Sequence, residues 1–146
     1  MYQHDVPLRT ALGLHEYRGR QVLLLADAAA HVLMLDAVTA EVLWTATVKV
    51  TSVSNVTAMP VLFEDRVFVP ISSGELNMGA AHDYECCRSH GAVVALDARD
   101  GATLWVYHTM EDAKPTGTSR VGTQQWGPSG APIWTAAAID EKRRLI

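Results

Sequence analysis

The sequence has no excess of basic residues and no long uninterrupted apolar run. Lys and Arg number 12 against 16 Asp and Glu, so the formal net charge is −4 at pH 7. The chain therefore lacks the basic surface by which proteins bind nucleic acid or anionic lipid. The most apolar stretch, residues 22–38, contains Asp27, His31 and Asp36. It falls short of the roughly 20 apolar residues of a membrane-spanning helix, and we expect neither a nucleic-acid partner nor a membrane span.

Cysteine is scarce as well, since the chain has only Cys86 and Cys87, which are adjacent. Adjacent cysteines exclude an ordinary disulfide framework and leave a strained vicinal disulfide, two free thiols or a metal site. The sequence has no Cys-x-x-Cys-His haem-attachment motif and no Gly-rich nucleotide-binding motif. Its N-terminus has neither the basic start nor the apolar core of a signal peptide, which taken literally predicts a cytoplasmic protein.

The main feature that is present is an internal repeat. The chain has 146 residues, of which 49% are apolar, so it can bury a sizeable core. Residues 32–44 align without a gap with residues 93–105, and Leu, Asp, Ala, Leu and Trp recur at the same offsets. Residues 19–25 match residues 64–70 upstream of the two copies, and residues 138–146 begin a third copy. Self-similarity of this kind indicates a chain built from repeated structural units.

Each repeat has the pattern of short strands separated by turns. In the second repeat, β-branched and apolar residues predict strands at about 57–63, 67–72, 92–97 and 103–109. The Ala-rich residues 26–35 allow a helix as an alternative, but their match to the Val-rich residues 92–97 favours a strand. A lone four-stranded sheet cannot cover both of its faces. Repeated four-stranded units therefore predict an all-β fold made of propeller blades.

The Asp and Trp that recur in both copies, and the Gly of the second copy, have a physical role in such blades. Asp97 precedes a turn, and its carboxylate can accept hydrogen bonds from the N–H groups of that turn. Gly101 supplies the positive φ that the turn needs. Trp105 follows on the outer strand, where its indole can pack against a neighbouring blade while its N–H finds a backbone carbonyl. Asp36 and Trp44 hold the matching positions of the first copy. We expect these residues to dock blade on blade.

Residues 95–105, Ala-Leu-Asp-Ala-Arg-Asp-Gly-Ala-Thr-Leu-Trp, resemble the tryptophan-docking motif of the quinoprotein propellers, with Asp100 in place of Thr. The first copy, residues 34–44, is weaker because Met34 replaces Ala and Ala40 replaces Gly. This motif implies the fold and is silent about chemistry, because the same repeat occurs in non-catalytic scaffold proteins.

Two further segments narrow the resemblance. Residues 84–97 contain the cysteine pair, and residues 125–140 contain Trp-Gly-Pro-Ser-Gly. Both resemble the corresponding segments of polyvinyl alcohol dehydrogenases, which depend on pyrroloquinoline quinone. The resemblance runs from about Leu23 to Ile146 and covers about two blades plus the start of a third.

The resemblance implies that residues 1–146 are one partial quinoprotein β-propeller. Its expected parts, in chain order, are a blade at 10–50, a blade at 57–109 with an insertion at 73–91, a loop at 112–132 and a truncated blade at 133–146. The expected loop is longer than the roughly 12 to 15 residues that are common in compact domains, so we interpret it as functional, disordered or both.

A bound quinone needs a plane on each face and groups that hold its carboxylates. The resemblance implies that Cys86 and Cys87 cover one face as a vicinal disulfide and that Trp134 covers the other. Arg88 would meet a cofactor carboxylate, and Gly130 lies in a loop that can bring backbone N–H groups to anionic oxygens. The alternatives are a disulfide that only staples its loop and an exposed loop arginine.

A quinone site of this family also uses Ca²⁺ to polarise the reactive carbonyl. Glu75 ends a Ser-Ser-Gly-Glu stretch that is similar to the family's calcium-binding stretch, which implies a calcium ligand; a solvated loop glutamate is the alternative. A competing interpretation of the insertion is a metal site made by its His, Asp and Cys side chains: His82, Asp83, Cys86, Cys87 and His90. Because zinc sites prefer two or more residues between paired cysteines, this interpretation is disfavoured.

The resemblance implies part of a dehydrogenase that oxidises an alcohol by hydride transfer to the quinone and passes electrons to a c-type cytochrome. In the family the general base and further calcium ligands lie beyond the position of residue 146, so no catalytic residue is assigned and the fragment alone is expected to be inactive. The family works in the periplasm, where a vicinal disulfide can persist. The alternative is a non-catalytic propeller of the same repeat that binds protein partners.

Overall fold

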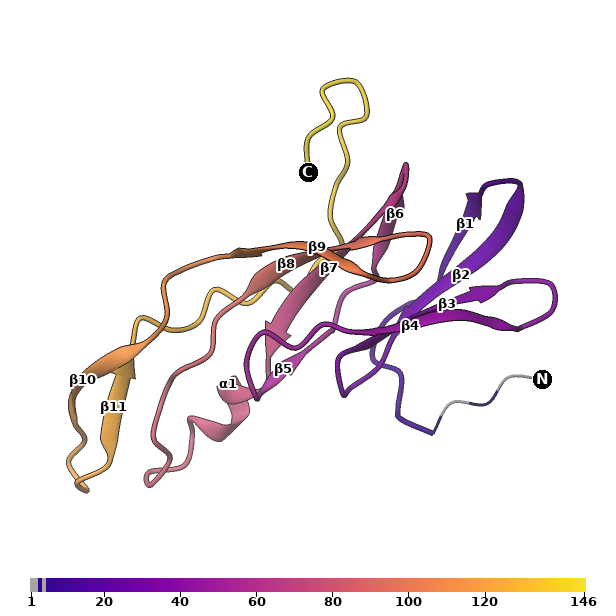
Figure 1. Ribbon diagram of the computed structural model, residues 1–146. Coiled ribbons are helices and arrows are strands. Elements are labelled where there is room, and N and C mark those ends of the chain that lie inside the picture. The colour runs from indigo at the N-terminus through magenta and orange to yellow at the C-terminus, as the bar shows by residue number, and fades with distance from the viewer. Residues whose placement is uncertain (1–2, 4) are drawn as a thin grey trace.

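The computed structural model describes residue 3 and residues 5–146 and consists almost entirely of antiparallel β-structure (Figure 1). The first sheet has the strand order β1-β2-β3-β4, and each strand pairs with the next one along the chain. Its strands are β1 (Gly13–Tyr17), β2 (Arg20–Ala26), β3 (His31–Asp36) and β4 (Val42–Thr47). Residues 26–35 therefore form the end of one strand, a turn and most of the next, as the repeat indicated.

The second sheet has the order β5-β7-β8-β9, with β6 pairing on the same edge of β7 as β5. Its strands are β5 (Ser54–Asn55), β6 (Val61–Phe63), β7 (Arg66–Ser73), β8 (Ala92–Asp97) and β9 (Thr103–His108). The bounds of β7, β8 and β9 lie close to three of the predicted strands, whereas the strand predicted at 57–63 is observed only at Val61–Phe63 and β5 was not predicted. The all-β prediction is confirmed, and the two sheets stand next to each other as separate units in Figure 1.

The core lies between the two sheets. Side chains alternate along a strand, so that every second residue of β2 faces the same way. Val22, Leu24 and Ala26 are fully buried and share one apolar cluster with Val69 and Ile71 of β7. The intervening leucines face the other side of the first sheet, where they form a separate cluster: Leu23, Leu25, Leu33 and Leu35. The first sheet thus has two apolar faces, and one of them packs against the second sheet.

Trp44 connects the two sheets. Its indole Nε1 donates a hydrogen bond to the carbonyl oxygen of Ala98 at 3.0 Å, in the turn that joins β8 to β9. The indole also lies on Gly101, where an added Cβ would come within 2.8 Å of the Cε3 atom of Trp44. Glycine is required there twice over, because Gly101 also has a φ of +76°.

The aspartates at the matching positions shape the turns that follow them. Asp36 Oδ1 accepts the backbone N–H groups of Val38 and Thr39, both at 2.9 Å. Asp97 Oδ1 accepts the N–H of Arg99 at 2.9 Å, and the Arg99 guanidinium also binds both carboxylate oxygens. The turn on which Trp44 docks is therefore held by an ion pair as well as by its backbone.

Trp105 differs from Trp44 in its surroundings. It is 41% exposed, and its ring centroid lies 6.0 Å from that of Phe68 in the same sheet. Every residue of β9 is exposed. The docking geometry expected at Trp105 is thus observed at Trp44, because among the described residues a neighbouring turn lies only against the first of the two tryptophans.

Two segments differ from the expected organisation. The predicted loop at 112–132 contains a β-hairpin of β10 (Lys114–Thr118) and β11 (Gln124–Gly127), whose register shifts at a bulge after Pro115. Residues 133–146 contain only an isolated bridge between Asp140 and Leu145. A strand needs a partner for its backbone N–H and C=O groups. Among the described residues, this segment's only backbone hydrogen bond to another segment is from the Ile133 N–H to the Ile71 carbonyl at 3.2 Å.

The insertion between β7 and β8 holds one short helix, α1 (Glu75–Met78). In Figure 1 this insertion and the β10–β11 hairpin extend from the same end of the second sheet. The Thr123 hydroxyl donates to the carbonyl of His82 at 3.4 Å, which joins the two extensions near their tips. No helix in the described part of the chain is long and apolar enough to cross a membrane.

Replacing Gly101 by Ala should destabilise the protein more than replacing Gly19 by Ala. The two glycines have nearly the same φ, +76° and +77°, but an added Cβ contacts nothing at Gly19. The positive φ should cost both variants about 1 kcal/mol, and crowding against Trp44 should cost Gly101→Ala about 1–3 kcal/mol more. Urea unfolding measures both free energies, and equal losses would contradict the proposed packing of the indole.

The stability that Asp97 provides should depend on pH. Its pKa is lowered to about 2, first by the side-chain hydrogen bond from Arg99 and then by the Arg99 backbone N–H. Since the unfolded carboxyl has a pKa of about 3.9, this stabilisation is complete above about pH 4 and is lost as the pH falls towards 2.

The difference in unfolding free energy between the wild type and Asp97→Asn should therefore shrink between pH 4 and pH 2. Asp36→Asn is the matched control for a carboxylate without a close ion pair. The pKa of Asp36 is lowered mainly by the backbone N–H groups of Thr39 and Val38. Arg20 Nη1 approaches Asp36 only to 4.0 Å. A wild-type-to-variant difference at Asp97 that stays constant over this range would exclude the ion pair as its source.

Candidate functional site

Cys86 and Cys87 form a disulfide in the insertion between α1 and β8, so the first of the three possibilities is the one observed. The loop that carries them pairs with the β10–β11 hairpin through backbone atoms. The Trp126 N–H donates to the Cys86 carbonyl at 2.8 Å, and the Cys87 N–H donates to the Trp126 carbonyl at 3.4 Å. The disulfide therefore lies where the two extensions of the second sheet meet.

One side of the disulfide is covered by the end of α1. Gly79 follows this helix, and a Cβ built on it would lie 3.0 Å from Cys86 Sγ and 3.4 Å from Cys87 Sγ. The backbone of the helix end thus approaches both sulfur atoms closely. A glycine at this position leaves the room that the disulfide occupies.

A small cavity of about 120 Å³ adjoins Cys87. Four of the residues that line it belong to the predicted site or lie next to it, namely Glu75, Cys87, Ser89 and Gly130. Gly130 has a φ of +105°, and its N–H donates to the Ser89 carbonyl at 2.9 Å. The structure therefore brings Cys87, Glu75 and Gly130 together from segments far apart in the sequence.

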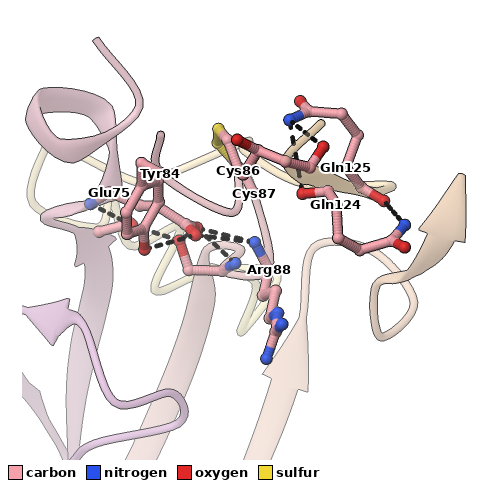
Figure 2. Close-up of a disulfide and its surroundings, with 10 residues drawn as sticks. Glu75, Tyr84, Cys86, Cys87, Arg88, Gln124 and Gln125 are labelled. Atoms are coloured by element: carbon pink, nitrogen blue, oxygen red, sulfur yellow. Dashed lines mark hydrogen bonds between the residues drawn. A yellow bond between two sulfur atoms is a disulfide. The ribbon is translucent and has the colours of Figure 1, made fainter. Parts of the chain in front are cut away.

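Glu75 is the buried acidic residue of this site, with only 4% of its surface exposed. Its Oε1 accepts hydrogen bonds from the Tyr84 hydroxyl and the Arg88 N–H, both at 2.9 Å. Its Oε2 accepts the Arg88 N–H at 3.0 Å, the Ser89 N–H at 2.6 Å and the Ser89 hydroxyl. Figure 2 shows these donors gathered around the carboxylate next to the disulfide.

These contacts keep Glu75 ionised. Burial by itself would raise the pKa of the Glu75 carboxyl. The hydrogen bonds from Ser89, Arg88 and Tyr84 outweigh burial, so that the pKa lies below its usual value. The same carboxylate raises the pKa of Tyr84, although burial of the phenol contributes more to that shift. A negative charge is thus held inside the loop at neutral pH.

Arg88 meets Glu75 only through its backbone, because its side chain points away from the carboxylate (Figure 2). Its guanidinium pairs with Glu85 and lies over the ring of Trp126, 3.8 Å from the ring centroid. About half of the Arg88 side chain is exposed. This cation is oriented by an aromatic plane and a carboxylate, and it remains accessible.

A second cavity, of about 260 Å³, adjoins this arginine. It lies between residues 51–53, which follow the first sheet, and the loop that contains Tyr84, Glu85 and Arg88. Glu75 and Ser89 line both this cavity and the one beside Cys87. The buried carboxylate is therefore part of the wall between two cavities.

Trp134 lies away from this group. It is 57% exposed and lines neither of the two cavities. The aromatic residue beside the disulfide is Trp126, whose Nε1 is buried and has no hydrogen-bond partner among the described residues. Sequence reasoning did not assign Trp126 to the cofactor, and its position in the Trp-Gly-Pro-Ser-Gly stretch was the available signal.

The described residues contain no group of three or more His, Cys, Asp or Glu side chains that could hold a metal ion. The alternative metal site in the insertion is therefore not observed, and its two cysteines are joined to each other. The surroundings of Glu75 do not fit a Ca²⁺ ligand either, because a carboxylate that binds Ca²⁺ must offer it free lone pairs. Around Glu75 the neighbours are N–H and O–H donors that already use its lone pairs.

Comparison with known proteins places the chain in a family. A family model named PQQ_2 and described as outer membrane protein assembly factor BamB matches residues 8–130. The chain belongs to this family. The crystal structure of BamB from Moraxella catarrhalis superposes with a TM-score of 0.52 and 19% identity, covering 74% of this chain and 26% of that one. The likeness shows the fold, a fragment of a β-propeller.

Two relatives have higher identity. A polyvinylalcohol dehydrogenase of Pseudomonas sp is 34% identical over 152 residues, which cover 99% of this chain. A polyvinylalcohol dehydrogenase of Sphingopyxis sp. (strain 113P3) is 37% identical over 128 residues, which cover 87% of this chain. The resemblance found in the sequence is thus confirmed. The chain spans 24% and 20% of the lengths of these two relatives.

Replacing Gly79 by Ala should stabilise the protein less than replacing Gly74 by Ala. Both glycines flank α1 with helical φ values, −65° and −76°, so alanine strains neither backbone. Each change should gain about 0.4–1 kcal/mol from the restricted unfolded chain. Only at Gly79 does the new Cβ crowd the disulfide, whereas at Gly74 its nearest neighbour is the Val53 carbonyl at 3.5 Å.

We expect Gly79→Ala to be less stable than Gly74→Ala by about 1 kcal/mol in urea unfolding, since close contacts in a packed site are costly to relieve. Two variants of equal stability would show that the helix end does not pack against the disulfide.

Proposed function

We propose that this chain is part of a quinoprotein alcohol dehydrogenase that resembles polyvinyl alcohol dehydrogenase. The observation that carries the proposal is the Cys86–Cys87 disulfide beside a cavity, in a chain 34% and 37% identical to two proteins named polyvinylalcohol dehydrogenase. A disulfide of adjacent residues is a flat and apolar group, suited to cover one face of a planar cofactor. The substrate class is an alcohol, which the whole enzyme oxidises.

Pyrroloquinoline quinone, when bound, would accept a hydride from the alcohol, and this hydride carries both electrons of the oxidation. The residues that would hold it are the disulfide on one face, Arg88 at a carboxylate and Gly130 at the edge of the cavity. Trp134 stays a proposal for the opposite face. Cys87 and Gly130 line the cavity of about 120 Å³, whereas Arg88 lines the second cavity, on the other side of Glu75. Because the first cavity is smaller than the roughly 300–1,000 Å³ of ordinary ligand pockets, the proposed site would extend over both cavities.

The chemistry of this wall supports a polyanionic and planar ligand. Arg88 offers a planar cation that can bind a carboxylate bidentately, and Trp126 keeps its guanidinium oriented. Glu85 pairs with Arg88 and would be displaced from it by a stronger anion. No proton-transfer step is assigned to a described residue, because the one buried carboxylate near the disulfide already accepts donors on both oxygens.

The remaining parts of the proposal come from the resemblance. They are a c-type cytochrome as electron acceptor and work in the periplasm, where a disulfide between adjacent cysteines persists. The proposed whole enzyme would bind Ca²⁺, but the hydrogen-bond donors around Glu75 do not form the calcium site. A second candidate function is a non-catalytic scaffold that binds protein partners, which the BamB description of the family model favours.

Reconstitution of the full-length gene product with quinone and Ca²⁺ tests the proposal. The folded protein should take up the quinone, seen by absorbance, and should then reduce a dye when an alcohol is added. A folded protein that takes up no quinone would reject the dehydrogenase and favour the scaffold.

Arg88→Met should weaken quinone binding about tenfold or more, because a charge-assisted hydrogen bond is worth about 1.5–3 kcal/mol. Arg120→Met is the matched control, since Arg120 is an exposed arginine at the tip of the β10–β11 hairpin. Equilibrium dialysis of the quinone compares the two variants. Equal affinities would remove Arg88 from the proposed site.

A further inference from the structure

The donors that meet the Glu75 carboxylate all come from one short segment. They belong to Tyr84, Arg88 and Ser89, which stand on both sides of the Cys86–Cys87 pair in the sequence. The carboxylate therefore bonds to the loop just before the disulfide and just after it. In Figure 2 the disulfide sits at the top of the turn that Tyr84 and Arg88 close around Glu75.

The lone pairs of the Glu75 carboxylate already accept hydrogen bonds. A carboxylate offers about four lone-pair positions. Oε1 accepts two donors, and Oε2 accepts three, one of which is shared with Oε1. A cation at either oxygen would have to displace an N–H group whose positive end already faces it. The arrangement favours a structural anion over a calcium ligand.

The helix end that carries Glu75 is itself held in place. The backbone N–H of Glu75 donates to the Ser73 hydroxyl at 3.0 Å, and that hydroxyl also contacts the Ser89 hydroxyl. Ser73 lies at the end of β7, a strand that is buried along most of its length. The carboxylate is thus connected through Ser73 to the rigid second sheet.

The other attachments of the loop are weaker. They include two backbone hydrogen bonds between the disulfide residues and Trp126, at 2.8 and 3.4 Å, and one from the Gly130 N–H to the Ser89 carbonyl at 2.9 Å. The Arg88 guanidinium also lies on the Trp126 ring. Trp126 belongs to the β10–β11 hairpin, whose β10 strand is exposed throughout. Charge-assisted hydrogen bonds are roughly twice as strong as neutral ones, so Glu75 dominates the attachment.

We propose that Glu75 is a positioning residue for the disulfide: its carboxylate ties residues 84–89 to β7 and so holds Cys86–Cys87 beside the cavity, without binding Ca²⁺. The role concerns the loop itself. It can therefore be tested without quinone, substrate or activity, and its failure is distinct from a failure of the proposed function.

The rate at which dithiothreitol reduces the disulfide measures this positioning. Thiol–disulfide exchange requires the reductant to reach a sulfur atom along the bond, so a looser loop reacts faster. Glu75→Gln should react about tenfold faster than the wild type, and Tyr84→Phe, which removes one donor, about two- to threefold faster. Alkylation with a mass tag followed by mass spectrometry counts the reduced cysteines over time.

Two variants serve as controls. Glu85→Gln removes the same charge from an exposed residue next to Cys86. Its reduction rate should stay within about twofold of the wild-type rate. Gly101→Ala lowers global stability at the Trp44 contact, away from the loop. An unchanged rate in Gly101→Ala separates local loosening from general destabilisation.

A folded Glu75→Gln variant with the wild-type reduction rate would overturn the proposal. If Glu75→Gln does not fold by circular dichroism, Tyr84→Phe and Ser89→Ala decide, and unchanged rates in both would overturn it. Millimolar CaCl₂ should leave the wild-type rate unchanged. A calcium-dependent rate in the wild type that disappears in Glu75→Gln would make Glu75 a calcium ligand and would reject our assignment.

Discussion

The two sheets bury one apolar face against each other, and the rest of the structure depends on this contact. Val22, Leu24 and Ala26 of β2 lie in the same cluster as Val69 and Ile71 of β7. Burying such side chains stabilises by roughly 25 cal/mol per Å² of apolar surface. The hydrogen bond from Trp44 to Ala98 fixes the relative orientation of the two sheets, because apolar burial alone does not determine how one sheet is rotated on the other.

The candidate site follows a different physical rule. The insertion between β7 and β8 lies outside the apolar core, and a buried carboxylate organises it. An ionised group inside a protein is tolerated when hydrogen bonds replace its water, and Glu75 receives donors on both oxygens. The two sheets are therefore held together by apolar burial, whereas the loop is held to the end of β7 by hydrogen bonds around one carboxylate.

The repeat, the all-β fold and most strands of the second sheet could be predicted because their signals are local. Alternation, turn residues and the Leu-Asp-Ala spacing all lie within a few positions of the elements that they specify. The hairpin β10–β11 was missed because Lys-Pro-Thr-Gly-Thr contains residues that strands disfavour. The donors of Glu75 and the place of Trp126 depend on contacts between segments apart in the sequence. The Trp-Gly-Pro-Ser-Gly stretch singles out Trp126 but does not say which side chains it contacts.

The hydrogen bond between Trp44 and Ala98 joins residues 54 positions apart, whereas β1 to β4 pair only with their neighbours along the chain. Contacts between near neighbours form faster than distant ones, because less chain entropy is lost when a short loop closes. The architecture thereby sets an order of assembly. Each sheet can form its own hairpins first, and the Trp44 indole can then fix the position of one sheet on the other.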